Sequence, residues 1–338
     1  MSALLGFRVL MVVTDDPAAR HTVEVARLLG SAGAVVGLQV APGAERWFGA
    51  ASLAHLAVAD RLDVSMVGLD WSPDAALVLG GEAARAAWAA STPGLPLLAP
   101  CSRRDEASTD WVLPTARRAL AGAPLAGRKV VVTAGPTVEH FDAVRFLSNP
   151  SSGKMGYAVA AAAWQAGAEV TLISGPTSLD APYGVRRVAV GSAREMRDAV
   201  LAGTADVVFK AAAVSDYRPA VRLAGKVKKT AGPWTLEMER TSDILTELAL
   251  SPMRPSLLIG FAAETDDIER YAREKLHAKS LDGIVANDVG AGGAFGSDSN
   301  RVECYDAAGS AVVFGPAAKQ EVAASIVAWA AALLARKQ

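Results

Sequence analysis

The feature that most constrains the fold of this chain is a repeated alternation of two kinds of segment. Short runs rich in β-branched residues, at 8–14 and 34–40, flank an alanine- and leucine-rich stretch at 18–33 that ends in a glycine. Two more short apolar runs follow at 75–80 and 96–100. Strands that alternate with helices predict a parallel sheet covered by helices on both faces.

The same alternation restarts after a polar stretch, punctuated by proline and glycine, at 103–128. We expect strands within 129–137, 169–174, 206–214, 256–264 and 282–288, helices at 153–168 and 192–203, a hairpin at 302–315 and a closing helix at 317–337. The chain is therefore predicted to be α/β, with two Rossmann-like or flavodoxin-like three-layer domains, 1–124 and 125–338, of mostly parallel strands. Ligands bind such sheets at the carboxyl ends of the strands.

Composition narrows the class of protein. A hydrophobic fraction of 51% with 20% charged residues is typical of a well-buried globular chain. The net charge of −1 argues against a nucleic-acid partner. No run reaches the ~20 apolar residues of a membrane span, and the first residues lack the basic start and cleavage site of a signal peptide. Cys101 and Cys304 lie far apart and fit a reducing compartment. We expect a cytoplasmic protein with small-molecule partners.

Two glycine-marked segments in the second half favour an anion site. "TAGPT", which contains Gly135, follows directly on a predicted strand, and its small residues would let backbone N–H groups approach a phosphate. Ser151, Ser152, Gly153 and Lys154 precede a predicted helix, whose first N–H groups are free to bind an anion. An ordinary tight turn and a plain helix cap are the alternatives. The spacing matches neither the P-loop nor the dinucleotide fingerprint.

Charged residues elsewhere in the second half point to a polyphosphate. Lys275 and Lys279 are four residues apart, on one face of a predicted helix. Lys226 lies in a basic, glycine-bounded segment that would be either a flap closing on phosphates or an exposed hairpin. Asp216 follows a predicted strand and could hold magnesium or a ribose hydroxyl, or cap a turn. Together these residues suggest a nucleoside triphosphate with a divalent metal.

Several ordered motifs between Gly127 and Gln338 carry a family resemblance. They are "TAGPT", "VRFLSNPSSGKMGYAVA", "AEVTLISGPTSL", "AAAVSDYRP", "GKVKK", "GFAAET", "YAREKLHAKSLDGIVANDV" and "FGSDSN". The segment closely resembles the phosphopantothenoylcysteine synthetase domain of bacterial bifunctional coenzyme A enzymes. The resemblance implies a ligase that uses CTP and Mg²⁺, joins a phosphorylated acid to cysteine through an acyl-cytidylate, and forms a homodimer.

The resemblance also implies roles for individual residues. Asn149 would hold the acyl-cytidylate and donate to its acyl oxygen. Arg145 would bind the phosphate or carboxylate of the acid through its planar fork, and Lys226 would serve catalysis and CTP binding. The implied CTP site comprises Lys210, Ala211, Ala212, Asp216, Lys226, Ser242, Asp243, Ile244, Leu245, Phe261, Lys275 and Lys279, with Asp216 as the metal ligand.

Some positions depart from the family pattern. Lys210 stands where relatives usually have a small residue, "TSDI" at 241–244 replaces Asn-Pro-Asp-Ile, and "TVEHFDAV" lacks a basic residue at Val138. These departures leave open a paralogue that uses the same CTP activation on a different acid or amine. A non-catalytic assembly or regulatory protein is a third alternative, but it would be expected to lose Arg145 and Asn149, which this chain keeps.

The first half resembles the partner domain of the same enzymes, a flavodoxin-like FMN decarboxylase. Where that family has a glycine-led turn for the FMN phosphate, this chain has Asp15, Asp16 and Pro17. No clear counterpart of the catalytic histidine is present, and Arg103 in "APCSRR" occupies the place of an asparagine. Carboxylates repel a phosphate. We therefore expect this domain to bind no FMN and to have no decarboxylase activity.

Overall fold

The computed structural model describes most of the chain. The described residues are 4–41, 43–47, 62–63, 73–79, 82–99, 109–120, 122–229, 232–264, 266–288 and 298–337. The chain divides into two compact units, 1–123 and 124–338. No helix among the described residues is long and apolar enough to cross a membrane.

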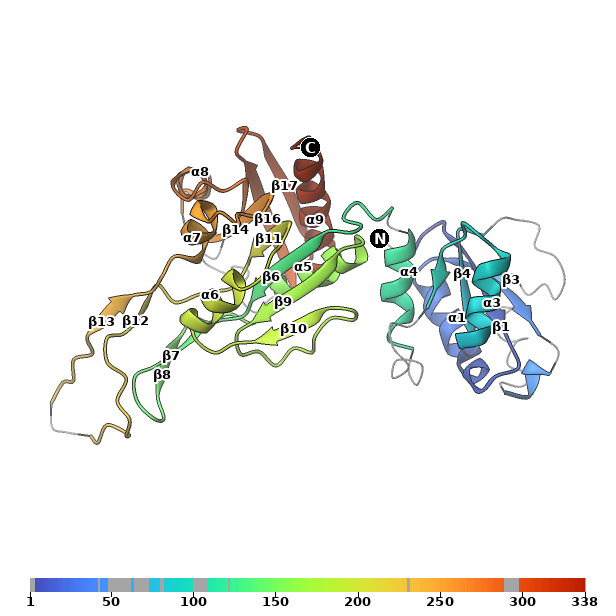
Figure 1. Ribbon diagram of the computed structural model, residues 1–338, viewed down its shortest axis with the longest axis horizontal. Helices are drawn as coiled ribbons and strands as arrows, with labels where there is room; N and C mark the ends of the chain where they lie inside the picture. Colours follow the sequence, from blue (N-terminus) through green and yellow to red (C-terminus); the bar gives the residue numbers. More distant parts are fainter. Residues whose placement is uncertain are drawn as a thin grey trace. The chain divides into compact units, whose positions relative to one another are not determined.

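The first unit contains a five-stranded parallel sheet in the order β3-β2-β1-β4-β5 (Figure 1). Its elements are β1 (Arg8–Val13), η1 (Pro17–His21), α1 (Thr22–Ser31), β2 (Val35–Val40), η2 (Ala44–Trp47), β3 (Leu62–Asp63), β4 (Ala75–Leu79), α3 (Glu82–Ser91), β5 (Leu97–Leu98) and α4 (Val112–Leu120). The predicted helix at 18–33 is wrong in its first turn, which is a 3-10 helix because Pro17 begins it and Asp16 caps it. The α3 helix was not expected from the sequence.

The second unit is built on an eight-stranded sheet in the order β10-β9-β6-β11-β14-β15-β16-β17. Its strands are β6 (Lys129–Ala134), β9 (Glu169–Ser174), β10 (Arg186–Ala189), β11 (Val207–Lys210), β14 (Leu257–Glu264), β15 (Gly283–Asp288), β16 (Ser299–Asp306) and β17 (Ala311–Ala318). Pairing is parallel from β10 to β15, and β16 and β17 are antiparallel. The predicted α/β fold with mostly parallel sheets is therefore confirmed.

Helices cover both faces of this sheet, as expected for a three-layer fold. The helices are α5 (Lys154–Gln165), α6 (Ala193–Leu201), α7 (Ile244–Leu250), α8 (Ile268–Ala278) and α9 (Lys319–Arg336). Apolar side chains of α5 and α9 share one core with Val130 and Val132, whereas those of α6, α7 and α8 share the other with Val131. Neighbouring residues of one strand thus serve opposite faces, because side chains alternate along a strand.

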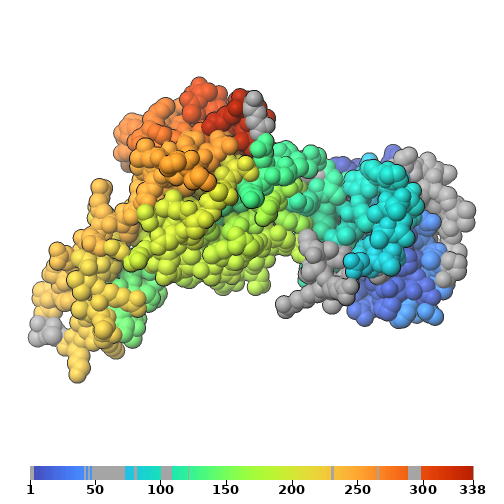
Figure 2. Space-filling model, in the orientation of Figure 1, coloured from blue at the N-terminus to red at the C-terminus, as the bar shows by residue number. Residues whose placement is uncertain are grey.

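Two short antiparallel pairs extend from the second unit (Figures 1 and 2). They are β7 (Val138–His140) with β8 (Phe146–Ser148), and β12 (Tyr217–Pro219) with β13 (Met238–Arg240). We call residues 138–148 the short arm and residues 217–240 the long arm. The arms lie side by side, with the Leu223 backbone N–H donating to the carbonyl of Phe141 at 3.0 Å. The predicted strand 206–214 is wrong beyond Lys210, because the chain leaves the sheet there to reach the long arm.

Candidate functional site

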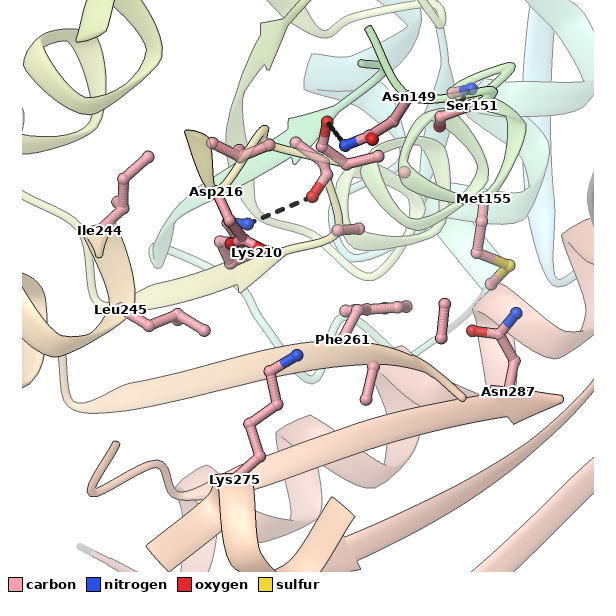
Figure 3. Close-up of a pocket in the computed structure, with 18 of the residues that line it drawn as sticks. Asn149, Ser151, Met155, Lys210, Asp216, Ile244, Leu245, Phe261, Lys275 and Asn287 are labelled. Atoms are coloured by element: carbon pink, nitrogen blue, oxygen red, sulfur yellow. Dashed lines mark hydrogen bonds between the residues drawn. The ribbon is translucent and has the colours of Figure 1, made fainter. Parts of the chain in front are cut away.

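A cavity of about 900 Å³ lies at the carboxyl ends of the parallel strands in the second unit (Figure 3). It is lined by segments that follow β6 and β11 and by the ends of β14 and β15. The strand order reverses between β6 and β11, since the chain proceeds from β6 to β9 on one side and to β11 on the other. Such a switch point is where open α/β sheets bind their ligands.

Close contacts between glycines shape one wall of this cavity. Gly153 precedes α5 with φ +77°, and a Cβ there would lie 2.8 Å from Thr177 Cγ2 and 3.3 Å from the backbone of Gly135. Gly135 itself does not line the cavity; it holds the loop after β6 against Gly175. Gly156 lets α5 approach β6, because a Cβ there would meet the Ala134 Cβ at 2.6 Å. These glycines bring the start of α5 to the carboxyl edge of the sheet.

The first turn of α5 presents backbone donors to the cavity. Lys154, Met155 and Gly156 all line it, and N–H groups in the first turn of a helix have no acceptor within that helix. The predicted residues Ser151 and Ser152 also line the cavity, and Ser151 Oγ accepts from the Gly153 N–H at 3.4 Å. This wall can therefore bind an anion.

Asn149 lies on the same wall, opposite the loop that follows β11 (Figure 3). Its Nδ2 donates to the carbonyl of Ala213 at 3.2 Å, which uses one of two amide hydrogens. The predicted residues Ala211 and Ala212 line the cavity from that loop, where the Ala212 N–H donates to Thr133 Oγ1 at 3.1 Å. The loop is thus held by β6, and it in turn holds the Asn149 amide.

Three lysines meet at one end of the cavity. Burial and the nearby charges of Lys275 and Lys279 lower the pKa of Lys210 to about 8, and its Nζ donates to the Ala212 carbonyl at 3.2 Å. Burial, and then Lys279, also lowers the pKa of Lys275. Lys279 is paired with Asp243 at 2.8 Å. Crowded cations of this kind favour a polyanionic ligand, because each one raises the cost of charging the others.

Asp243 connects this lysine cluster to the start of α7. Its carboxylate accepts from the backbone N–H groups of Leu245 and Thr246, so it caps the helix. Burial opposes its ionisation, but the Lys279 ammonium and the donors of Thr246 hold its pKa below the usual range. The predicted residues Ser242, Ile244, Leu245 and Phe261 line the same end, and the last three supply an apolar surface beside the lysines (Figure 3).

A second group of polar residues, which the sequence analysis did not single out, lines the cavity near the start of α5. Lys319, 6% exposed, comes from the first turn of α9, and Asn287 and Asn300 come from β15 and β16. The pKa of Lys319 is lowered by burial and by Lys154, and Asp298, which pairs with Lys154 at 2.6 Å, partly offsets this. A buried lysine at a helix start has no sequence signature that separates it from a surface lysine.

The predicted residues Arg145 and Lys226 lie in the arms and do not line the cavity. The Arg145 guanidinium forms two hydrogen bonds to the buried Asp142 carboxylate, donates to the Val227 carbonyl at 3.1 Å, and lies over the Phe141 and Trp234 rings. Despite burial, Arg145 and backbone donors hold the pKa of Asp142 well below its usual range. Arg145 therefore fastens the short arm to the long arm.

Asp216, the predicted metal ligand, lines the cavity at the base of the long arm. Among the described residues, no group of three or more His, Cys, Asp or Glu side chains is placed to hold a metal. Mg²⁺ is usually held by one or two carboxylates together with substrate phosphates and water. Among the described residues, the cavity carboxylates Asp216 and Asp243 are thus too few for an all-protein cage, and their number suits an ion that shares its ligands with substrate phosphates.

In the first unit, the two carboxylates that replace the expected FMN phosphate turn are already engaged. Asp15 pairs with Arg46 at 2.9 Å and accepts from Trp47 Nε1 at 2.9 Å. Asp16 accepts from the Ala18 N–H at 2.9 Å and so caps η1. Arg103 and Cys101 lie outside the described residues, and Cys304 is buried in β16.

Comparison with known proteins agrees with the fold of the second unit. The Coenzyme A biosynthesis bifunctional protein CoaBC of Bacillus subtilis is 56% identical to this chain over 187 residues, which are 54% of this chain and 46% of that protein. CoaBC of Vibrio vulnificus is 47% identical over 187 residues, which are 54% of this chain and 47% of that protein. The crystal structure of the C-terminal domain of a CoaBC protein, 42% identical, superposes with a TM-score of 0.55 over 63% of this chain and 99% of that one. The chain thus spans about half the length of the curated relatives it matches.

A family model supplies the remaining comparison. The DNA/pantothenate metabolism flavoprotein C-terminal domain matches residues 125–334, which contain the whole cavity and both arms. The resemblance that the motifs carry over 127–338 is thereby confirmed. The chain belongs to the family of the DNA/pantothenate metabolism flavoprotein C-terminal domain.

Proposed function

We propose that the second unit is a CTP-dependent ligase that joins a carboxylic acid to an amine through an acyl-cytidylate, with 4′-phosphopantothenate and cysteine as default substrates. The observation that carries the proposal is the cavity at the switch point. It combines the start of α5, five lysines (Lys154, Lys210, Lys275, Lys279 and Lys319) and an apolar wall at Phe261. A nucleoside triphosphate needs these three kinds of surface: donors and cations for its phosphates, and an apolar face for its base.

The chemistry explains why a triphosphate is used. A carboxylate oxygen is a poor leaving group, so the carboxylate attacks the α-phosphate of CTP, a new oxygen–phosphorus bond forms and pyrophosphate departs. The amine nitrogen then attacks the acyl carbon, CMP leaves with the carboxylate oxygen, and the nitrogen gives up a proton. Asn149 would donate its second amide hydrogen to the acyl oxygen as negative charge develops there. The lysines would bind the phosphates during both steps.

Magnesium is part of this proposal. Asp216 is the cavity carboxylate that would hold it, with phosphate oxygens of the nucleotide completing its ligands. Bound there, the ion would neutralise charge on the phosphates. Asp243 is less suited because its carboxylate caps α7 and pairs with Lys279.

The arms support the proposed homodimer. They expose large apolar side chains, including Phe146 at 52%, Val221 at 65% and Trp234 at 47%. Exposed apolar clusters of this kind mark interaction surfaces, and the family resemblance implies that a second copy covers them. Since the curated relatives are named for coenzyme A biosynthesis, we place the reaction in the cytoplasm.

One observation favours a second candidate, a paralogue that activates a different acid or amine. Lys210 brings an extra cation into the cavity, and Thr241 and Ser242 line it where relatives usually have asparagine and proline. An extra cation favours a substrate with more negative charge, and new hydroxyls add hydrogen-bond partners.

A pyrophosphate-release assay with the full chain tests both candidates. CTP, Mg²⁺ and 4′-phosphopantothenate should release pyrophosphate, and mass spectrometry should detect the amide after cysteine is added. ATP in place of CTP serves as the control nucleotide. Release with another acid, but none with 4′-phosphopantothenate, would support the paralogue. If no acid in a broad panel releases pyrophosphate from CTP, the ligase proposal is wrong.

A further inference from the structure

A second pocket, of about 290 Å³, lies between the first turns of α6 and the base of the long arm. Its polar lining consists of Arg194, Arg197, Arg218, Arg240, Thr241 and Ser242. The last three also line the main cavity, so the two sites adjoin. No carboxylate of a described residue lines this pocket, although carboxylates elsewhere in the second unit pair with some of its arginines.

Acidic residues outside the pocket hold two of the arginines in place. Arg197 Nε lies 2.9 and 2.8 Å from the two carboxylate oxygens of Glu247 in α7, and this pair joins α6 to α7. Arg218 Nε donates to Glu239 across the β12–β13 pair at 2.8 Å. Paired carboxylates fix the planes of both guanidinium groups. An arginine that is held before a ligand arrives loses less entropy on binding.

The other two arginines retain free donors. Arg194 approaches Asp198 only at 3.9 Å, beyond hydrogen-bond distance, and its side chain is 77% exposed. The Arg240 guanidinium forms no hydrogen bond or ion pair with any residue that the structure describes. Arg197 is fully engaged, since its Nη1 also donates to Asp198 at 2.9 Å, so the unused donors of the pocket belong mainly to Arg194 and Arg240, each with five N–H groups.

We propose that this pocket binds a phosphate group, carried either by a substrate whose other end fills the main cavity or by a separate phosphorylated small molecule. A tetrahedral phosphate has oxygens for several guanidinium groups at once, and charge-assisted pairs with arginine are the strong class of hydrogen bond. The pocket volume of about 290 Å³ lies just below the ~300–1,000 Å³ range of ligand sites, so the pocket has room for a phosphate together with the neighbouring part of the molecule that carries it.

The pocket lies at one of the positions where this sequence departs from the family pattern. Thr241 and Ser242 belong to "TSDI", which replaces the usual Asn-Pro-Asp-Ile. They form the shared rim between pocket and cavity. The Thr241 hydroxyl donates its hydrogen to the Ser215 carbonyl at 2.6 Å, so it faces a ligand as an acceptor and holds the rim in place, and serine at position 242 removes the rigid proline ring. Phosphate binding itself can be measured without turnover, whereas the assignment of the phosphate to a substrate rests on the proposed ligase reaction.

Isothermal titration of the full chain with inorganic phosphate tests the proposal. Arg194→Ala should weaken phosphate binding about tenfold, because it removes a charged donor. The matched control is Arg270→Ala: Arg270 is also an exposed arginine at the start of a helix with an acidic partner four residues on, but it lies in α8. Lys275→Ala should retain the phosphate signal if the anion occupies the pocket rather than the main cavity. Equal affinity in wild type and Arg194→Ala, or loss of the signal in Lys275→Ala alone, would overturn the proposal.

Kinetics then distinguish the two sources of the phosphate. If the group belongs to a substrate, Arg194→Ala raises the KM for the phosphorylated acid and leaves the KM for CTP unchanged. If it belongs to a separate molecule, free phosphate alters the rate of the wild-type protein, and this response is weaker in Arg194→Ala. Both results support the pocket as a phosphate site.

Discussion

At the scale of single residues, position in the cavity decides which polar side chains can take part in chemistry. Asn149 and Lys210 both line it, and each is held by a carbonyl of the loop after β11. Arg145 was expected to bind substrate from its motif, yet its guanidinium is engaged by Asp142 and two aromatic rings. Its role as a substrate ligand remains a prediction, and the contacts favour a positioning role between the arms.

We predict that Asn149→Ala blocks amide formation while CTP still binds. One preorganised donor to a developing oxyanion is worth roughly 3–4 kcal/mol, or a loss of about 10² to 10³ in rate. Rapid-quench measurement of the amide product, with a parallel CTP titration, checks this. Asn149→Asp is the matched control, since it keeps the size and removes the amide donor. Near-normal ligation by either folded variant would remove Asn149 from the mechanism.

Lys210 predicts a pH dependence for nucleotide binding. Its pKa is lowered to about 8, so its amine is charged below that pH and becomes neutral above it. Bound phosphates favour the charged form, so CTP affinity should be highest below about pH 8 and should fall as the pH rises through it. CTP titrations between about pH 6.5 and 9.5 test this. Lys210→Met should flatten the profile near pH 8, and an unchanged profile in that variant would assign the titration to another group.

At the scale of elements, the arms hold two residues outside the cavity. The family resemblance places Arg145 and Lys226 in the site, but both lie in the arms and do not line the cavity. Lys226 lies in the long arm, outside the cavity lining, and the Asp142 carboxylate joins the arms by accepting from the backbone of Val227 at 3.1 Å. The alternatives for this basic segment were a flap over phosphates and an exposed hairpin. The structure shows a paired base with a long exposed loop, which is compatible with a flap that closes on a bound nucleotide.

We predict that Lys226→Ala weakens CTP use far more than Lys229→Ala. Both lysines are exposed in the same loop, and surface charges contribute little to stability, so both variants should fold. Only Lys226 matches the nucleotide-binding lysine of the family. The KM for CTP, measured for the two variants side by side, decides the matter. Equal and small changes would mean that the loop is simply solvated.

At the scale of the whole molecule, the two units differ in how far a function can be assigned. The family match covers residues 125–334, within the second unit. The sheet of the first unit has the order 3-2-1-4-5, which is the Rossmann order rather than the flavodoxin order 2-1-3-4-5. Its loop after β1 contains Asp15 and Asp16, so a fold suited to nucleotides does not by itself supply a phosphate site here.

We predict that the purified full chain is colourless and binds no FMN at micromolar concentration. Asp15 is paired with Arg46 and Trp47, and Asp16 occupies the first donor of η1, so a phosphate would have to displace both carboxylates. A phosphate within ~4 Å of a carboxylate is also repelled by about 1 kcal/mol in water. Absorbance spectra, with fluorescence of the supernatant after denaturation, check for flavin. A yellow preparation or a stoichiometric FMN titration would contradict this reading.

The sequence by itself determined the layers of both units and the cavity wall at the start of α5. Alternating apolar runs predict parallel strands and covering helices because burial on two faces requires them, and glycines before α5 predict a close approach of backbones. The α3 helix and the arm strands were not predicted, because α3 buries no side chain and each arm strand is only three residues long. Local periodicity carries little signal in such segments.

Only the tertiary structure decided which distant residues meet. Lys319 reaches the cavity because α9 packs against α5, and Asn300 of β16 reaches it beside the same helix, where its Nδ2 donates to Met155 Sδ at 3.7 Å. These segments lie more than a hundred residues apart in the sequence, and no local pattern records their contact. The arginine pocket likewise depends on α6 lying next to the base of the long arm. The sequence specifies the chemistry of each side chain. Whether several charged side chains meet at one point depends on long-range packing, which cannot be inferred from a single sequence.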